Sequence, residues 1–264
     1  MNRAVPRVRL VVPTTGRRPY YIRQCLDSIR RQSQPVEIVI VGPTAAASLL
    51  ESLAMRYRCR FVAERATGLS NAVNQGWEGA DADYLGWLGD DDLLAQGAVA
   101  VAIEELDRNA AAAMVYGRVR VIDAESNHIY TIRPGRLASW FIKYGQNFVW
   151  QPGSLYRRAA LGKAGLLDPS LHYAMDYDLH LRLRQQGSLS YVPRLLASYR
   201  RHPEALTALN PDPYAERLIV MRRYLGPVAR SLEGCWWPAA KYTCRAWGYA
   251  QILTGRREKP APAS

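Results

Sequence analysis

Three consecutive carboxylates, Asp90, Asp91 and Asp92, follow an apolar run, Tyr84–Leu88, that has the composition of a buried strand, and one glycine, Gly89, separates the two. Three negative charges at the end of a core strand are unfavourable unless a cation lies among them. Mg²⁺ or Mn²⁺ would serve, because these ions take oxygen ligands and share them with the phosphates of a substrate. The alternative is a solvated acidic turn that caps the next helix, since Asp is a favoured N-cap residue.

The three carboxylates are not expected to be equal ligands of one ion. Side chains alternate along an extended segment, so Asp90 and Asp92 should point together and Asp91 should point away.

A second acidic position, Asp176, begins a segment that we expect to be helical and that carries Leu179, Leu181 and Leu183. A carboxylate placed there could act as a general base that takes a proton from an attacking hydroxyl group. Asp178 is the alternative for this role. Either residue could instead only cap the helix, because the helix dipole favours Asp at an N-terminus.

The composition suits one large α/β domain, with or without a helical extension. The chain has 264 residues, of which 48% are hydrophobic, and its formal net charge is +12. This excess of positive charge fits phosphate-bearing or other anionic partners. We expect no nucleic acid, because the arginine pairs are scattered and are typical of solvated faces. These pairs are Arg17–Arg18, Arg30–Arg31, Arg157–Arg158 and Arg222–Arg223.

The four cysteines, at positions 25, 59, 235 and 244, match no zinc or CxxC pattern. The N-terminal segment lacks the pattern of a signal peptide, and no apolar run reaches the length of a membrane span. We therefore expect a cytoplasmic protein.

Late in the chain Trp236, Trp237 and Trp247 accompany Lys241 and Arg245. This cluster is either a peripheral contact with the inner face of a membrane or a helix packed on the catalytic domain.

The first 95 residues alternate between strands and helices, which predicts βαβ units and a parallel sheet. Ligands bind beyond the C-terminal ends of the strands in such sheets, where Gly16, Gly42 and the three aspartates would lie. The expected strands are 8–13, 36–41, 60–63 and 84–88, and the expected helices are 20–34, 45–58 and 68–79.

The pattern changes after residue 95. We expect a helix over 99–108, paired strands over 113–122 and 128–132, a helix over 176–186, and two short strands over 190–193 and 197–200. Beyond His202-Pro203 the chain is expected to be mainly helical to Leu253, with a disordered tail over 256–264.

Several motifs stand out by their order and spacing. They are Val11-Val12-Pro13-Thr14 with Cys25–Ile29, Gly68–Gly76, Trp87–Leu94, Gln151-Pro152 with Tyr173–Leu183, and Tyr199–His202. Over about residues 7 to 207 the chain thereby resembles the family 2 glycosyltransferases. The resemblance implies a GT-A fold, an α/β architecture with a mixed, mostly parallel sheet flanked by helices, here followed by a C-terminal helical extension. It divides the chain into a catalytic domain over 1–205 (donor half about 7–95, acceptor half about 96–205) and an extension over 206–264.

The resemblance also assigns residues. It implies Asp176 as the catalytic base, Asp92, Asp91 and His202 as ligands of Mg²⁺ or Mn²⁺, and Gln151 and Asp178 on the acceptor side. The implied donor-binding residues are Pro13, Thr14, Thr15, Gly16, Glu64, Gly68, Asn74, Asp90 and Asp91. Three places depart from the family pattern: Gly42-Pro43-Thr44 has no acid after the second strand, Met175 replaces a common Glu, and Gly89 replaces the first acid of the metal motif.

The function expected from this resemblance is inverting transfer of a sugar from a nucleoside-diphosphate donor to a hydroxyl of a glycan or lipid-linked acceptor, as in cell-surface polysaccharide biosynthesis. Two alternatives stay open. The first is a metal-dependent nucleotidyltransferase acting on a sugar phosphate, although Thr14–Arg18 contains only one glycine for a triphosphate loop. The second is a non-catalytic basic binding module.

Overall fold

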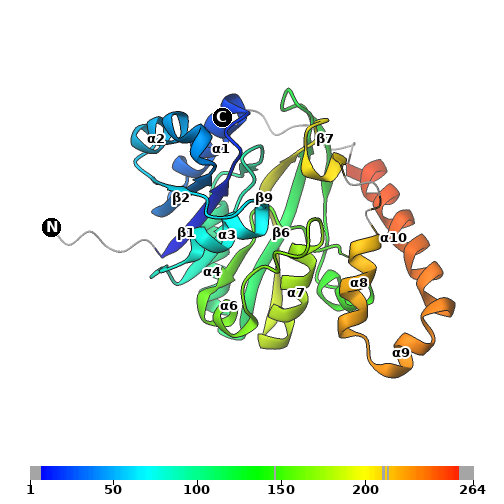
Figure 1. Ribbon diagram of the computed structural model, residues 1–264. Helices are drawn as coiled ribbons and strands as arrows, with labels where there is room; N and C mark the ends of the chain where they lie inside the picture. The colour runs from blue at the N-terminus through cyan, green and yellow to red at the C-terminus, as the bar shows by residue number, and fades with distance from the viewer. Residues whose placement is uncertain (1–6, 146, 210–211, 213, 256–264) are drawn as a thin grey trace.

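The computed structural model describes residues 7–145, 147–209, 212 and 214–255, without the side chains of 244, 245, 248, 251, 252, 254 and 255. One twisted sheet runs through the molecule, helices cover both of its faces, and the last helices lie beside its far end (Figure 1). The expected disordered tail lies outside the described residues.

The first part of the chain forms the parallel half of the sheet in the strand order β3-β2-β1-β4. The apolar runs predicted as strands become β1 (Val8–Pro13), β2 (Val36–Gly42), β3 (Arg60–Ala63) and β4 (Tyr84–Trp87). The helices between them are α1 (Pro19–Arg30), η1 (Thr44–Ala46) with α2 (Ala47–Arg56), and α3 (Leu69–Trp77). The βαβ prediction is confirmed, and it brings the ends of β1, β2 and β4 to one edge.

The second part continues the sheet in the order β4-β8-β6-β9-β5, with β7 paired to β6. Here β6 and β9 are parallel, whereas the pairs β4–β8, β6–β8, β6–β7 and β5–β9 are antiparallel. The sheet is therefore mixed, as expected. Its elements are β5 (Leu93–Leu94), α4 (Ala98–Arg108), β6 (Ala112–Ile122), β7 (His128–Ile132), α5 (Ala138–Phe141), η2 (Ile142–Tyr144), β8 (Leu155–Arg157), α6 (Arg158–Ala164), α7 (Met175–Gln186) and β9 (Ser188–Arg200).

The expectation of two short strands near the end of this half was wrong, because β9 is a single strand that passes through Pro193. Tyr116 pairs with Tyr191 and Arg118 pairs with Leu195, so the register with β6 shifts around the proline. A bulge of this kind accommodates a residue that has no backbone N–H. The short elements β5, β8, α5 and α6 were not predicted, because a few residues carry too little periodicity.

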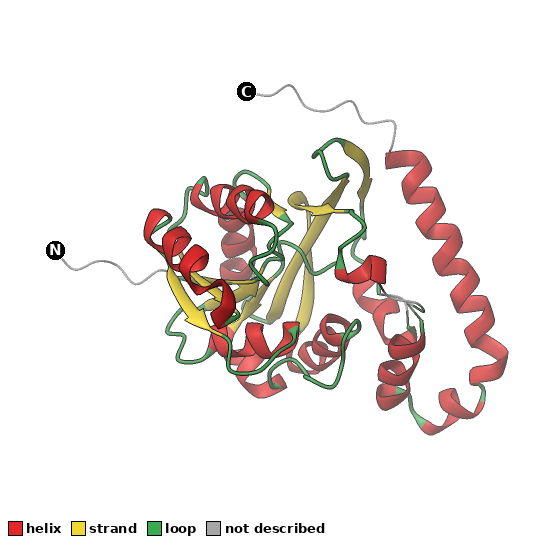
Figure 2. Cartoon of the chain, turned by 45° about the horizontal axis from the view of Figure 1, so that its top comes forward, coloured by secondary structure: helices red, strands yellow, loops and turns green. Residues whose placement is uncertain are grey.

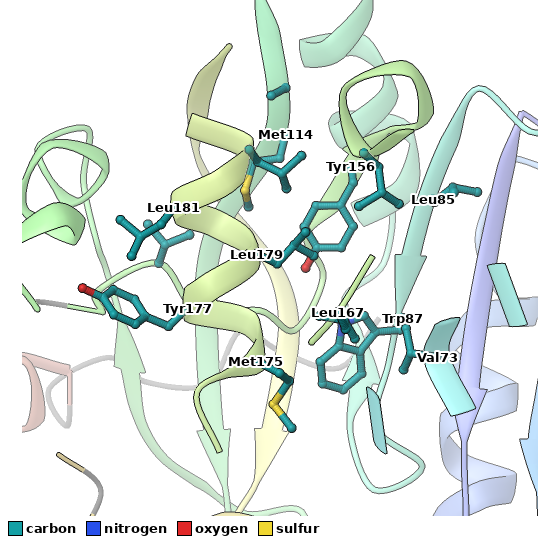
Figure 3. Close-up of a cluster of buried hydrophobic side chains, with 14 of the residues drawn as sticks. Val73, Leu85, Trp87, Met114, Tyr156, Leu167, Met175, Tyr177, Leu179 and Leu181 are labelled. Atoms are coloured by element: carbon teal, nitrogen blue, oxygen red, sulfur yellow. The ribbon is translucent and has the colours of Figure 1, made fainter. Parts of the chain in front are cut away.

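Two hydrophobic cores lie on opposite faces of the sheet. Along β1, Leu10 and Val12 pack with residues of α1, α2 and α4, whereas Val11 packs with residues of α3, α6 and α7. Figure 3 shows part of the second core, in which Leu179 of α7 lies against Tyr156 and Met175 lies on the side of Trp87, the last residue of β4. The beginning of α7 is thus held beside the end of β4.

The C-terminal segment contains η3 (Leu206–Leu209), α8 (Ala215–Tyr224), α9 (Pro227–Ser231) and the long α10 (Glu233–Gly255), which runs beside β7 (Figure 2). Trp247 packs against Phe148 with tilted rings whose centroids are 4.2 Å apart, and it joins a small core around Tyr130. Trp236 donates its indole N–H to the carbonyl of Ala229. The predicted extension therefore packs on the body, although its status as a separate domain stays a prediction.

Gly76 sets the distance between α3 and β1, because a Cβ at this position would lie 2.5 Å from Cγ2 of Val11. We expect Gly76→Ala to lower the free energy of unfolding by about 1–3 kcal/mol through overpacking. Gly162 in α6 is the matched control, since no described atom lies within 4 Å of its Cβ position. Gly162→Ala should be neutral or should stabilise by up to about 1 kcal/mol. Chemical denaturation measures both, and equal effects would contradict this account of the packing.

Candidate active site

The three aspartates form a tight turn at the C-terminal end of β4. After Leu88 has paired with Val11, the N–H of Asp92 donates to the carbonyl of Gly89 at 3.1 Å and the chain enters β5. Gly89 leaves the room that this turn needs, since a Cβ there would lie 2.8 Å from Oδ1 of Asp91. Asp90 and Asp92 are 3% and 5% exposed. The solvated acidic turn is therefore excluded as a description of this segment.

The expected alternation of the carboxylates was wrong, because the segment is a turn and not an extended strand. Asp90 and Asp91 both bind the guanidinium of Arg18, whose Nη2 lies 2.7 Å from Oδ1 of Asp90 and whose Nη1 lies 2.9 Å from Oδ2 of Asp91. Asp92 instead accepts the backbone N–H of Arg200 at 3.0 Å. Arg18 was expected to lie on a solvated face, so its place among the carboxylates corrects that interpretation too.

His202 completes this group from the far end of the chain, just beyond β9. Its Nε2 lies 2.8 Å from Oδ2 of Asp91 and 2.8 Å from Nη1 of Arg18, and its ring stacks near Tyr21 of α1. The structure thus brings together the predicted ligands Asp91 and His202, which are 111 positions apart in the sequence.

Asp91 and His202 fit a divalent cation as a pair of neighbouring ligands. Two ligand atoms at right angles and about 2.1 Å from one ion are about 3 Å apart, and the two atoms here are 2.8 Å apart. Among the residues that the structure describes, no group of three or more acidic, histidine or cysteine side chains is arranged to hold an ion. Hard cations commonly complete their coordination with water and substrate phosphates, so two or three protein ligands would suffice.

Arg200 was not predicted as a site residue, yet it fixes the shape of the acidic turn from beneath. Its side chain is completely buried and donates to the backbone carbonyl of Asp91 at 2.9 Å, to Oε1 of Gln24 at 2.7 Å and to the turn at 123–126. Its guanidinium also lies 4.5 Å from the ring centroid of Tyr21. A buried arginine needs this number of acceptors, and here three separate segments of the chain supply them. No local sequence pattern could have indicated these contacts.

Burial raises the pKa values of two acidic groups in this site, Asp90 and Asp92. Desolvation raises the pKa of Asp90 to about 6, against the opposing effects of Arg18 and of the hydroxyl of Thr14, which donates to Oδ2. Desolvation, followed by the charge of Asp91, raises the pKa of Asp92 well above its ordinary value. The site therefore favours any cation that comes close to these oxygens.

The predicted donor-side residues surround the ends of β1, β2 and β3. Pro13 ends β1, Thr14 bonds to Asp90, Thr15 is exposed, and Gly16 adopts a φ of 75° with its N–H donating to Oγ1 of Thr14. A side chain at Gly16 would also collide with Ala46. Glu64 pairs with the end of β2 through a bond from its N–H to the carbonyl of Gly42.

Two other predicted donor residues lie at the start of α3 and within it. Gly68 precedes the helix with a φ of 109° and is exposed. Asn74 exchanges two hydrogen bonds with the backbone of Leu167, at 2.8 and 3.0 Å. The amide of Asn74 therefore braces the segment before α7, which is a structural use that the sequence did not indicate.

The two acceptor-side aspartates differ in their surroundings. Asp176 is the second residue of α7, and burial raises its pKa, opposed by the N–H of Tyr177 and by the charge of Arg217. Asp178 is 2% exposed, forms an ion pair with Arg182 at 2.8 Å and accepts the hydroxyl of Tyr224 at 3.0 Å. The oxygens of Asp178 are thus engaged within the fold.

Two residues place α7 and the turn relative to each other. Gln151 is buried and donates its side-chain amide to the carbonyl of Trp87 at 2.7 Å, which supports the end of β4. Glu216 of α8 accepts the backbone N–H groups of His172, Tyr173 and Ala174 just before α7. The N-terminus of α7, which carries Asp176, is therefore capped by the C-terminal segment.

A surface hollow of about 670 Å³ lies at the opposite edge of the sheet and is lined by residues that include Arg7, Asp83, Asp107 and Arg157. Arg7 is paired with both aspartates at 2.8 Å, and Arg157 donates to backbone carbonyls. These charges compensate one another, so the hollow is a less convincing site than the acidic turn.

Comparison with known proteins places the chain in a family. Residues 10–165 match the model of glycosyl transferase family 2. This match covers more than half of the chain, so the protein belongs to that family, as the resemblance predicted.

Individual relatives agree with this family assignment. The chain is 27% identical over 222 residues to the uncharacterized glycosyltransferase EpsJ of Bacillus subtilis, covering 78% of this chain and 64% of EpsJ. It is 25% identical over 209 residues to the chondroitin synthase of Escherichia coli, covering 76% of this chain and 30% of the synthase. The chain thus spans less than two thirds of the length of these relatives.

Solved structures with the same fold include two with bound donors. One is S. aureus TarS 1-349 with UDP-GlcNAc, at a TM-score of 0.63 and 16% identity, covering 83% of this chain and 65% of that one. Another is the mannosyltransferase PcManGT of Pyrobaculum calidifontis with GDP-Man and Mn²⁺, at a TM-score of 0.60 and 18% identity. This match covers 95% of this chain and 76% of that one. The predicted GT-A fold is confirmed, and it agrees with the membership of the chain in glycosyl transferase family 2.

The raised pKa of Asp90 predicts a pH-dependent effect on stability. The pKa of Asp90 is roughly 4 in the unfolded chain and about 6 in the folded protein. The protonated group therefore contributes fully to the free energy of unfolding below the first value, and this contribution is lost as the pH rises through the second. In Asp90→Asn the amide keeps the shape of the carboxyl group but does not ionise in this pH range. We expect the stability of this variant relative to the wild type to rise by about 1.4 kcal/mol between pH 5 and pH 8. Urea unfolding at both pH values measures this, and a difference that does not change with pH would contradict the burial argument.

Proposed function

We propose that this protein is an inverting, metal-dependent glycosyltransferase that moves a sugar from a nucleoside-diphosphate donor to a hydroxyl of a glycan or glycolipid. The observation that carries the proposal is the buried acidic turn at the carboxyl ends of the parallel strands. It begins just after Trp87, which belongs to the same hydrophobic cluster as Met175 at the start of α7. Asp91 and His202 would hold Mg²⁺ or Mn²⁺ with Asp92 beside them, and the ion would neutralise the leaving diphosphate. Structural neighbours bind UDP-GlcNAc, or GDP-Man with Mn²⁺, which supports this donor class.

Asp176 is our candidate for the general base. Its raised pKa reflects a carboxylate that is poorly solvated and therefore gains from accepting a proton. In the proposed step Asp176 takes the proton of the acceptor hydroxyl while that oxygen forms a bond to the anomeric carbon. The bond from this carbon to the diphosphate oxygen breaks on the opposite face, so the configuration inverts.

The remaining predicted residues are given supporting roles. Thr14, Thr15, Gly16 and Glu64 lie at the strand ends where the nucleoside would bind, and Gln151 holds the end of β4. We propose no substrate contact for Asn74 or Asp178, because the amide of one and the carboxylate of the other are engaged within the fold. A role in cell-surface polysaccharide assembly is consistent with the relationship to a chondroitin synthase.

Exchanging the two aspartates of α7 for asparagine tests this assignment. Asp176→Asn should lower the rate of transfer by ~10²–10⁴ while nucleotide binding is retained. Asp178→Asn should retain transfer but should destabilise the protein by about 2 kcal/mol, because it weakens a buried ion pair. A panel of UDP-, GDP-, dTDP- and CMP-linked sugars with Mn²⁺, assayed for release of nucleotide, provides the measurement.

Full transfer by Asp176→Asn would reject Asp176 as the base. Release of pyrophosphate from a nucleoside triphosphate and a sugar phosphate, without any sugar transfer, would favour the nucleotidyltransferase alternative. Salt-dependent binding of nucleic acid with neither activity would favour the basic binding module.

The surface around α5 supports the proposal of a peripheral membrane contact. The tryptophans predicted for this role are packed on the body, and the side chain of Arg245 lies outside the described residues. Exposed apolar side chains occur instead at Leu137, Trp140 and Phe141, with Lys143 placed 5.3 Å from the ring centroid of Trp140. The sequence contains no Asp or Glu from 126 to 167, so this surface suits an anionic bilayer. None of the described helices has the length and apolar character required to span a bilayer.

Sedimentation with vesicles tests this contact. The wild type should bind vesicles of phosphatidylglycerol and phosphatidylcholine, and a Trp140→Ser, Phe141→Ser variant should bind at least severalfold more weakly because it loses apolar insertion. Met55→Ser removes an exposed apolar side chain from α2 and should bind like the wild type. Equal binding by all three proteins would exclude the α5 surface as the contact.

A further inference from the structure

Arg18 binds two carboxylates of the acidic turn, Asp90 and Asp91, and also contacts His202. One guanidinium nitrogen is bound to Asp90 at 2.7 Å, and the other lies 2.9 Å from Asp91 and 2.8 Å from His202. The side chain is 21% exposed, so it has a route toward solvent. Arg18 thereby supplies the positive charge that these desolvated carboxylates require.

We propose that Arg18 and the divalent cation occupy this place alternately, so that the metal binds only as the guanidinium leaves. This inference rests on the metal site of the proposed function. The Nη1 atom of Arg18 already lies within hydrogen-bonding distance of the same two atoms, Oδ2 of Asp91 and Nε2 of His202, that would ligate the ion. A guanidinium and a divalent cation cannot share these oxygens at such distances, because their charges repel strongly when only partly solvated.

The histidine contacts favour this exchange. Nε2 of His202 faces an obligatory donor, Arg18, and an acceptor, the Asp91 carboxylate, at the same distance of 2.8 Å. A protonated ring nitrogen can donate a hydrogen bond to the carboxylate but cannot accept one from the guanidinium. An unprotonated ring nitrogen can accept from the guanidinium but cannot donate to the carboxylate. A cation in place of Nη1 would satisfy the lone pairs of both ligands.

Donor binding would compensate the displaced arginine. Arg18 lies at the N-terminus of α1, next to the loop where the proposed donor binds, so a diphosphate offers its guanidinium new oxygen partners. Metal and donor should therefore bind together, and metal alone should bind weakly.

Titration with Mn²⁺ alone, followed by the electron paramagnetic resonance signal of free Mn²⁺, tests the exchange without any catalytic step. Arg18→Met should bind Mn²⁺ at least tenfold more tightly than the wild type, because it removes the competing cation. Arg17→Met is the matched control, since Arg17 is the exposed neighbour, and its affinity should equal that of the wild type. In the Arg18→Met background, Asp91→Asn should abolish the gain.

Unchanged or weaker Mn²⁺ binding by Arg18→Met would overturn the proposal, as would an equal gain in Arg17→Met. If Arg18→Met fails to fold by circular dichroism, Arg18→Gln replaces it, because it also removes the competing charge while it keeps a polar side chain. This variant should bind Mn²⁺ more tightly than the wild type, and no gain would again overturn the proposal. If the wild type transfers no sugar but Arg18→Met still binds Mn²⁺ more tightly, the exchange is supported and the proposed function is rejected. If the wild type transfers sugar but Arg18→Met shows no gain in Mn²⁺ affinity, the proposed function is supported and the exchange is rejected.

Discussion

Desolvation of adjacent carboxylates at the end of β4 is the constraint on which the rest of this site depends. Asp90 and Asp92 are almost completely buried, and burial raises the pKa of each. Such groups are tolerated only where donors and cations meet them. Here the donors come from both ends of the catalytic region: Arg18 and Thr14 follow β1, whereas Arg200 ends β9 and His202 lies just beyond it. The fold must therefore close the first loop onto the last strand.

The long strand β9 performs this closure. It runs parallel to β6, shifts register around Pro193 and then pairs with β5, the two residues that directly follow the acidic turn. Its last residue, Arg200, consequently lies beneath Asp91 and its backbone meets Asp92. An error in the register of β9 would change which side chain reaches the turn, so the bulge at Pro193 is coupled to the geometry of the site.

The sequence predicted what depends on local pattern and missed what depends on contacts between distant segments. Apolar runs and helical spacing were enough for the parallel half of the sheet, and the position of the aspartates followed from it. The predicted direction of those side chains was wrong, because the same residues can form either a turn or an extended strand. The turn forms because Gly89 has no side chain to collide with Asp91. Arg18 was assigned to solvent for a related reason. Its partners lie more than 70 positions away, and an arginine pair carries no sign of them.

The two aspartates of α7 show how surroundings distinguish residues that a motif cannot. Both lie in the first turn of the same helix, so both could interact with its dipole. Asp178 faces Arg182 and Tyr224, which satisfy its oxygens and tie α7 to α8. Asp176 is desolvated and meets only weaker opposing influences, so its pKa rises. Glu216 then fixes the backbone just before this residue from α8. The C-terminal segment thus contributes to the position of the candidate base, although the family match ends at residue 165.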